Sequence, residues 1–523
     1  MSVLSSTHAS PIQNAARRVI GARGPRALRF VMWIVIAAVA LYAIYLVAMN
    51  AFIRTRLFRN AIDFDPNAFT VEYTNAYSLF PTRVHVDDLR IRGRDSSVEW
   101  ILAIDHADFR LSPLELLHHR FAAHHVRGDG LSLRARLYVD SKDVTPELTA
   151  ELPPVPGFSD PPLNPEGPKP TLTDAQYNLW SVDLEDVDAA NVREIWIQSV
   201  RLAGDMHVSG RWLFRPERWL DIGPAHVDAH RLEATIGEAT NGKKALATSV
   251  ETSLDVTVSP FDVRVPVGFE ILKYVTIDGD VRGEVATSNL IGLAKIEGVK
   301  VNADRRDPFK ARLRIEEGVL HHGTRFETAT HLRTRVGPTE VTGNVKADVF
   351  AETQKHGGAV DLSGTMLAFD EVATEQEPKT RDWWAKVTLH KATLSNAREP
   401  RFHGFIDATA RDAEPAVTIV AGNTAVPMWL AKVFGMHDLH AHAELRIAPG
   451  AFDVLSAEAK GNDAASIRAD YVKRFGMTNG AVLAELGPLA AGVKLGDESG
   501  LVLLGATSWF ERQSAWLHVR AER

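Results

Sequence analysis

Residues 100–136 decide the fold class, and they read WILAIDHADFRLSPLELLHHRFAAHHVRGDGLSLRAR. Two runs within this stretch alternate apolar and polar residues. The apolar members are Ala107, Phe109 and Leu111 in the first run and Leu131, Leu133 and Ala135 in the second. Such alternation turns one face of a β-strand towards apolar material and the other face towards water. The stretch therefore predicts amphipathic strands with one apolar face.

The same alternation recurs along the rest of the chain. The runs are 206–214, 254–258, 261–267, 311–315, 341–351, 385–389 and 439–447, and the fifth contains Val345, Ala347 and Val349. A parallel βαβ fold would instead show continuous apolar strands separated by long helices. We therefore predict a mostly β protein built on an elongated, curved, mainly antiparallel sheet.

Helical segments after the membrane span are expected to be short and few. The sequence favours them at 54–63, 113–119 and 428–434. The second begins with Ser112, which suits an N-cap, and Pro113, which suits the first helical position.

Glycines recur inside the predicted strands, two residues after an apolar residue, at Gly210, Gly283, Gly343 and Gly364. Glycine in a strand interior marks a bend, a bulge or a close backbone approach. Chance is the alternative, because the chain has 36 glycines and many strands.

The N-terminal region carries a membrane-spanning segment. Between Arg29 and Arg54 lie 24 residues without a charge, FVMWIVIAAVALYAIYLVAMNAFI. About 20 apolar residues cross a bilayer core, so this run can span it with some tilt. A cleaved signal peptide is the alternative, but its apolar region would be shorter and would end in a small-residue cleavage site.

The arginines around the span predict its orientation. Five arginines and no acidic residue precede the span within 1–29, whereas three arginines follow it closely. Positive charge favours the cytoplasmic side, so we predict a cytoplasmic N-terminus with the bulk of the chain across the inner membrane, in the periplasm.

Composition excludes several classes of function. The chain has 523 residues, a net charge of −7, 45% hydrophobic residues and no cysteine. The absence of cysteine excludes disulfides, thiolate metal sites and a cysteine nucleophile. The negative charge gives no support to nucleic-acid binding, so we predict no nucleic-acid partner.

Proline density sets the predicted boundaries. Residues 141–180 hold nine of the 26 prolines, which a β ladder does not tolerate. The predicted order is a basic cytoplasmic tail at 1–29, a transmembrane helix at 30–53, an N-terminal β module at 54–140, a Pro-rich linker or loop at 141–180, and a C-terminal β-groove domain at 181–523.

Motifs for catalysis are weak. The run Gly237–Lys243 matches most of a phosphate-binding loop, but Lys244 stands where Ser or Thr is required. A calcium-loop candidate that starts at Asp63 lacks the required Gly and Glu, since Ala68 and Thr74 occupy those positions. No acidic pair stands out as an acid and base. We predict no enzyme, no catalytic residue and no cofactor.

Histidines are the remaining candidates for metal binding. His440, His442 and Glu444 share one face of a predicted strand, and paired histidines occur at 118–119 and 124–125. Three ligands spaced along one strand face rarely converge on a single ion. The alternative is the polar face of an alternating strand, and we predict no metal site.

Residues 83–139 carry a resemblance to a known family. The run RVHVDDLRIRGRD is followed by the stretch quoted above, which gives strands, a Leu-rich short helix and a hairpin with a Gly-Asp-Gly turn. Placed after a single transmembrane helix, this order resembles the AsmA-like proteins of diderm bacteria, which include TamB-like and YhdP-like members. The resemblance implies a repeating β-groove anchored in the inner membrane, phospholipid transfer or outer-membrane homeostasis, and an outer-membrane or periplasmic protein partner.

An apolar strip that is left open is a ligand surface, whereas a closed core hides it. Alternation alone does not distinguish an open groove from a closed core. The span favours the groove, because it places the strip beside a source of lipid. The predicted lipid-groove residues are Phe109, Leu111, Leu131, Leu133, Ala135, Val345, Ala347 and Val349, with phospholipid or another acyl lipid as ligand. The alternative function is a non-catalytic β-rich scaffold for envelope proteins.

Overall fold

The computed structural model describes most of the chain. The described residues are 24–55, 69–94, 98–118, 120–137, 139–140, 155–158, 163–164, 181–215, 219–236, 245–262, 273–289, 299–300, 305–336, 339–353, 359–374, 382–395, 401–412, 436–462, 465–474, 476–496 and 500–522. The predicted helix at 428–434, nearly all of that at 54–63, the run Gly237–Lys243 and the calcium-loop candidate that starts at Asp63 lie largely or wholly outside these residues.

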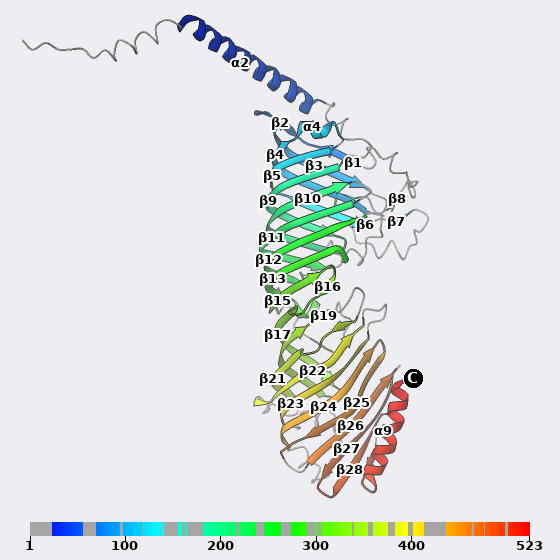
Figure 1. Ribbon diagram of the computed structural model, residues 1–523. Helices are drawn as coiled ribbons and strands as arrows, with labels where there is room; N and C mark the ends of the chain where they lie inside the picture. Colours follow the sequence, from blue (N-terminus) through cyan, green and yellow to red (C-terminus); the bar gives the residue numbers. More distant parts are fainter. Residues whose placement is uncertain are drawn as a thin grey trace, which may run out of the picture.

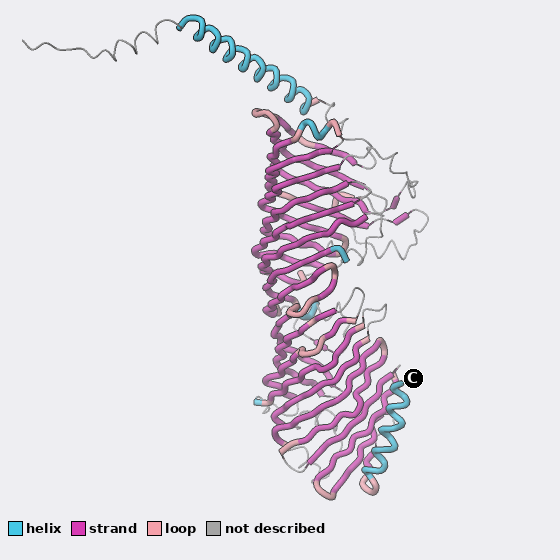
Figure 2. The backbone as a smooth tube through the Cα atoms, in the orientation of Figure 1, coloured by secondary structure: helices cyan, strands magenta, loops and turns pink. Residues whose placement is uncertain are grey.

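One long sheet makes up the body of the protein (Figure 1). It contains 27 strands within the described residues, and a separate pair, β7 and β8, forms a small second sheet. Figure 2 shows the strands stacked one after another along an elongated, curved body, with α2 at one end and α9 at the other. The predicted fold class, mostly β with a single long apolar N-terminal helix, is confirmed.

The first half of the chain contributes these elements: α2 (Gly24–Arg54), β1 (Phe69–Glu72), β2 (Asn75–Tyr77), β3 (Arg83–Arg94), β4 (Val98–Leu111), α4 (Pro113–Leu116), β5 (Arg120–Asp129), β6 (Ser132–Leu137), β7 (Val139–Asp140), β8 (Leu163–Asn164), β9 (Ser181–Ile197), β10 (Val200–Arg215), β11 (Trp219–Ile236), β12 (Ala247–Asp262) and β13 (Val275–Val285).

The second half contributes β14 (Val299–Lys300), β15 (Asp307–Glu316), β16 (Val319–Leu320), β17 (Arg325–Val336), β18 (Thr339–Phe350), β19 (Glu352–Thr353), β20 (Val360–Asp361), β21 (Met366–Thr374), β22 (Trp384–Leu394), β23 (Phe402–Asp412), β24 (His437–Ala448), β25 (Ala451–Lys460), β26 (Ala465–Arg474), β27 (Met477–Leu486), β28 (Leu489–Gly496), β29 (Gly500–Val502) and α9 (Ala506–Glu522).

The sheet continues across the Pro-rich stretch at 141–180. Strands β5 and β6 pair with β4 on one side and, in parallel, with β9 on the other. Because β9 starts beside Arg120, where β5 begins, the chain must return along the full length of β5 and β6 before β9 can form. A parallel pair requires such a crossover connection, which is the physical reason for a long segment at this place.

The two faces of the sheet differ in chemistry. We call the face that bears Leu102 and Leu133 the inner face and the face that bears Arg92 and Arg134 the outer face; alternate residues of each strand belong to each. The crossover segment 155–158 lies on the outer face, where the carbonyl of Pro156 accepts a hydrogen bond from Arg134 Nη1 at 3.0 Å.

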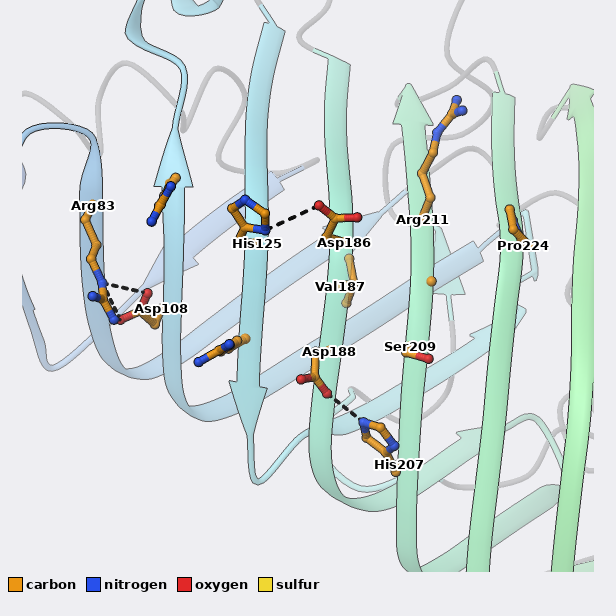
Figure 3. A pocket seen from close by; sticks show the side chains of 13 residues that line it. Arg83, Asp108, His125, Asp186, Val187, Asp188, His207, Ser209, Arg211 and Pro224 are labelled. Carbon is orange, nitrogen blue, oxygen red and sulfur yellow. Dashed lines mark hydrogen bonds and ion pairs between the residues drawn. The ribbon is translucent and has the colours of Figure 1, made fainter.

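Bulges bend the strands. Residues with positive φ interrupt the pairing register in many strands, and they include Asp186, Arg231, Ser249, Glu371, Lys391 and Ser456. A bulge adds one residue to one strand and bends it sharply. Figure 3 shows the outcome: strands run down one wall, bend, and continue behind as the opposite wall.

Three of the four glycines singled out in the sequence lie at or opposite these bulges. A Cβ at Gly210 would lie 2.7 Å from Ala225 Cα, and one at Gly343 would lie 2.9 Å from Val372 Cγ2. Gly283 faces the bulge at Ser249. Gly364 instead occupies the turn that precedes β21.

Two helices differ from expectation. Helix α4 covers only Pro113–Leu116, and the Ser112 side chain makes no capping hydrogen bond but lies 3.2 Å from His124 Nε2. Helix α9, which the sequence analysis does not predict, packs Phe510 and Leu517 on the outer face of the last strands, against Leu483 and Val472.

Candidate functional site: the inner face of the curved sheet

Apolar residues form an unbroken row across the inner face of the first lobe, β3 to β13. We call such a row of residues, paired from strand to strand, a rung. The strand register joins one residue from each of eight neighbouring strands. The rung consists of Ile91, Leu102, Leu133, Ile195, Leu202, Ala234, Ala247 and Val285. Every member is apolar, so the inner face of this lobe has a continuous apolar floor.

A second apolar rung crosses nine strands of the other lobe, from β18 to β28. It consists of Ala347, Leu367, Val387, Ala408, Ala441, Ala459, Ile467, Ala484 and Ala491. The register links it to the first lobe through Thr328, Phe309 and Gly283. The first rung, by contrast, continues from Val285 to the buried carboxylate of Asp307, which accepts hydrogen bonds from Thr287 and Thr330. The two apolar stretches of the inner face are therefore joined through β15 and β17 beside a buried polar cluster.

The rung one residue away, on the outer face, has the opposite character. It consists of Lys346, Ala368, Lys386, Thr409, His440, Lys460, Ser466, Glu485 and Ala490. Polar residues dominate this rung. The period-two pattern of the sequence thus separates an apolar wall from a solvated one across the same strands.

Inner-face residues at the rim remain accessible to solvent. Ile197 is 50% exposed, and Ile236 and Ile447 are 39% and 40% exposed. In a closed core such side chains would lose nearly all of their exposure. Helix α9 and the segment 155–158 both lie on the outer face, so neither shields these residues.

Two aromatic residues meet across the mouth of the first lobe. The register aligns Trp100 with Ala135, Ile197 and Val200, at the start of β10. Phe214 lies near the other end of β10, about 46 Å further along a straight strand. Yet the rings of Trp100 and Phe214 lie edge to face with centroids 5.9 Å apart. The strands must therefore fold the inner face into a groove.

Helix α2 occupies one end of this groove. Ile53 is 2% exposed and packs in a cluster with Ala76, Val84 and Phe109, and Met49 and Phe52 lie against the same cluster. The hydroxyl of Tyr73 donates a hydrogen bond to the carbonyl of Ile53. The last turn of the apolar helix is therefore part of the protein core.

The predicted groove residues divide into two sets. Phe109 and Leu111 lie on the inner face but are buried, at 8% and 3% exposure, under the end of α2. The remaining residues are partly exposed on the inner face, and they are Leu131, Leu133, Ala135, Val345, Ala347 and Val349.

Other inner-face residues were missed by the sequence analysis. Trp100 and Ile197 line the groove although only their register partner, Ala135, was predicted as a groove residue, and Phe214 was predicted only as part of an alternating strand. Alternation alone could not single them out, because each has an apolar neighbour in its strand, namely Ile101, Leu213 and Trp196 for Trp100, Phe214 and Ile197 respectively.

A polar hollow of about 860 Å³ lies on the outer face of the same lobe (Figure 3). Within it Arg83 pairs with Asp108 at 2.8 Å, and His207 Nε2 lies 2.6 Å from Asp188. The charges largely compensate one another. This surface is therefore suited to water, and the groove lies on the other side of the same strands.

His440, His442 and Glu444 share the outer face of β24, and the last two make ion pairs with residues of neighbouring strands. His442 lies 3.6 Å from Glu458, while Glu444 contacts His403 and Arg446. Burial opposes ionisation of Glu444, but hydrogen bonds from Arg446 and His403 outweigh it and lower the pKa of that carboxyl. Within the described residues, no group of three or more histidine, aspartate or glutamate side chains is placed to hold a metal ion.

Comparisons with known proteins identify no relative: no family model matches the chain, and neither the curated proteins nor the solved structures searched include a match.

Proposed function

We propose that this protein binds the acyl chains of phospholipids in its apolar groove and carries them within the cell envelope, anchored in the inner membrane by α2. In this proposal the N-terminus is cytoplasmic and the sheet stands in the periplasm. Transfer is passive, and an outer-membrane or periplasmic protein partner receives the lipid at the far end.

The apolar floor carries the proposal. Two rungs of apolar residues, one through Leu133 and one through Ala347, run along the inner face of β3–β13 and β18–β28. A surface of this length that stays partly exposed calls for an apolar ligand. A linear acyl chain matches it better than a compact molecule, because each apolar stretch is long and crosses eight or nine strands.

The anchor supports the choice of ligand. Residues 29–54 form a helix with a mean hydropathy of 2.6 in its most apolar window, none of which is buried. A helix of this kind is stable in a bilayer, and its last residues pack at the end of the groove. Membrane lipid would thus lie next to the apolar floor.

The proposal places the chain with the AsmA-like proteins, in agreement with the resemblance at residues 83–139. It also explains why an apolar wall and a charged wall share every strand. Lipid tails would lie on the inner face, and headgroups would remain at the wet rim, where their charge keeps its hydration.

Site-specific photo-crosslinking in cells tests the proposal. A benzophenone amino acid at Val345 faces the groove, whereas the same group at Lys346, one residue away, faces the outside. We expect crosslinked phospholipid, detected by mass spectrometry, from Val345 and not from Lys346. Equal yields at the two positions, or crosslinks from Val345 to protein alone, would rule out the lipid groove.

A further inference from the structure

Two tyrosines within the apolar span bind the turn between β2 and β3. Tyr42 Oη donates to the carbonyl oxygen of Leu79 at 2.7 Å, and Tyr45 Oη donates to that of Phe80 at 2.9 Å. Both residues lie in the middle of the 24-residue uncharged run, where a polar side chain facing lipid would be costly. Each instead satisfies a backbone carbonyl of the turn.

Asn50 completes the same helix face. Its Nδ2 donates to the carbonyl of Ser78 at 2.9 Å, and its Oδ1 accepts from the backbone N–H of Ser78 at the same distance. Residues 42, 45, 49, 50 and 53 share one side of a helix at 3.6 residues per turn. This side of α2 therefore binds residues 78–80.

The length of the span sets how deep in the bilayer these contacts lie. The 24 uncharged residues extend about 36 Å, while the hydrocarbon core is about 30 Å thick. If the hydrocarbon core begins at Phe30, it therefore ends near Met49. The residues beyond Met49, such as Ile53, are those that pack into the protein. Tyr42 then lies about 10 Å inside the core, at the level of Leu79.

The segments at this level expose large apolar side chains. Leu79 and Phe80 are 49% and 58% exposed, and Leu114 and Leu117 in and after α4 are 73% and 76% exposed. The two segments are neighbours, because the N–H of Leu111 donates to the carbonyl of Thr82. Such a cluster in water would be unfavourable, whereas in lipid it is stabilising.

Charged residues flank these segments. Arg83 begins β3 after the turn, and the exposed Arg110 precedes α4. Arginines at this position suit the headgroup region, where long basic side chains reach the interface. Glu115 of α4 pairs with Arg120 and Asp108 pairs with Arg83, so the acidic groups beside these segments are matched by arginines. Apolar tips flanked by such charged residues match the layers of a membrane surface.

We propose that the turn 78–82 and helix α4 are inserted into the bilayer leaflet on the C-terminal side of α2. The N-terminal end of the groove then sits within the leaflet instead of above it. The tyrosines of α2 make this possible, since irregular backbone in hydrocarbon needs an internal hydrogen-bond partner. The inference rests on the anchor and the lipid function proposed above, and it names the phospholipid bilayer as the occupant of this surface.

The chain has no cysteine, so single-cysteine variants of the full chain can be labelled at one site each. Phe80→Cys carries the fluorophore NBD at the proposed inserted tip. Phe405→Cys, a 42% exposed residue on the outer face of β23, is the matched control. The variants are reconstituted in vesicles of phosphatidylethanolamine and phosphatidylglycerol, with or without lipids that bear a nitroxide on the acyl chain.

For Phe80→Cys we expect blue-shifted NBD emission and strong quenching by the acyl-chain nitroxide; for Phe405→Cys we expect neither. Val39→Cys, 61% exposed on α2, reports whether the anchor itself is in lipid. Quenching at residue 39 with none at residue 80 would overturn this inference alone. No quenching at residue 39 would overturn the anchor, whereas failure of the Val345 crosslink would remove the lipid function and leave insertion standing.

Discussion

Trp100 and Phe214 join the two rims of the groove, with ring centroids 5.9 Å apart in an edge-to-face contact, although they belong to opposite ends of the sheet's width. The contact sets the width of the mouth at that point. It also shows that the inner face encloses space, which the register of neighbouring strands alone would not show. A ligand in the first lobe must pass beneath this pair or along the groove.

The rim contact should be measurable as a coupling energy. Truncation of Trp100 and Phe214 to Ala, singly and together, is expected to give a coupling of about 1 kcal/mol, typical of an aromatic pair. Chemical denaturation of the four proteins measures it. Trp100→Ala combined with Phe452→Ala, a residue of the other lobe, should be additive. Additivity of Trp100 and Phe214 would mean that the rims do not meet.

Charges on the inner face should remove lipid without unfolding the sheet. In the double variant Val345→Asp and Val349→Asp, the carboxylates can hydrate once lipid has left, because both positions are only partly buried. Circular dichroism should remain that of a β protein, while the bound phospholipid measured by mass spectrometry falls. Thr342→Asp, on the outer face of the same strand beside Arg333, is the control and should keep its lipid. Aggregation of the double variant, together with wild type that carries no lipid, would indicate a packed core instead.

The outer face should contribute a pH-dependent term to stability. The hydrogen bond with Asp255, opposed by slight burial and aided by the charges of Asp228 and Asp255, raises the pKa of His226 above its ordinary value of 6.5. A raised pKa means that the pair stabilises fully below about pH 6.5 and that this contribution is lost as the pH rises through the folded-state pKa. NMR titration of the His226 ring measures the pKa.

Asp255→Asn should lower the pKa of His226 towards its ordinary value and reduce the stability gained at acidic pH. Asp188→Asn, which acts on His207 instead, should leave the His226 titration unchanged. An unaltered His226 pKa in Asp255→Asn would show that the pair does not form in solution.

The bulge at Gly210 should tolerate no side chain. Its φ is 155°, and a Cβ at this position would lie 2.7 Å from Ala225 Cα, so Gly210→Ala forces neighbouring backbone apart. We expect a loss of about 1–3 kcal/mol in the free energy of unfolding, measured by chemical denaturation. Gly500→Ala, where no atom lies within 4 Å, is the control and should be nearly neutral. Equal stability of the two variants would contradict the close packing of β10 on β11.

Much of the fold follows from the sequence because its signals are local. Alternation is a property of each strand by itself, so the runs around Leu133 and Ala347 identify both the strands and the face that each residue occupies. The uncharged run between Arg29 and Arg54 identifies the long helix in the same way. The apolar and the charged face could therefore be assigned before any pairing was known.

What the tertiary structure decided depends on contacts between distant residues. Which strands pair, and that β9 runs parallel to β5, depend on a crossover of some forty residues whose path no local pattern encodes. The meeting of Trp100 with Phe214 depends on bulges that accumulate over several strands. The docking of Leu79 on Tyr42 was likewise hidden, although the spacing of Tyr42, Tyr45 and Asn50 along one helix face was a signal for it. Periodicity specifies a face, but only long-range pairing specifies what that face encloses.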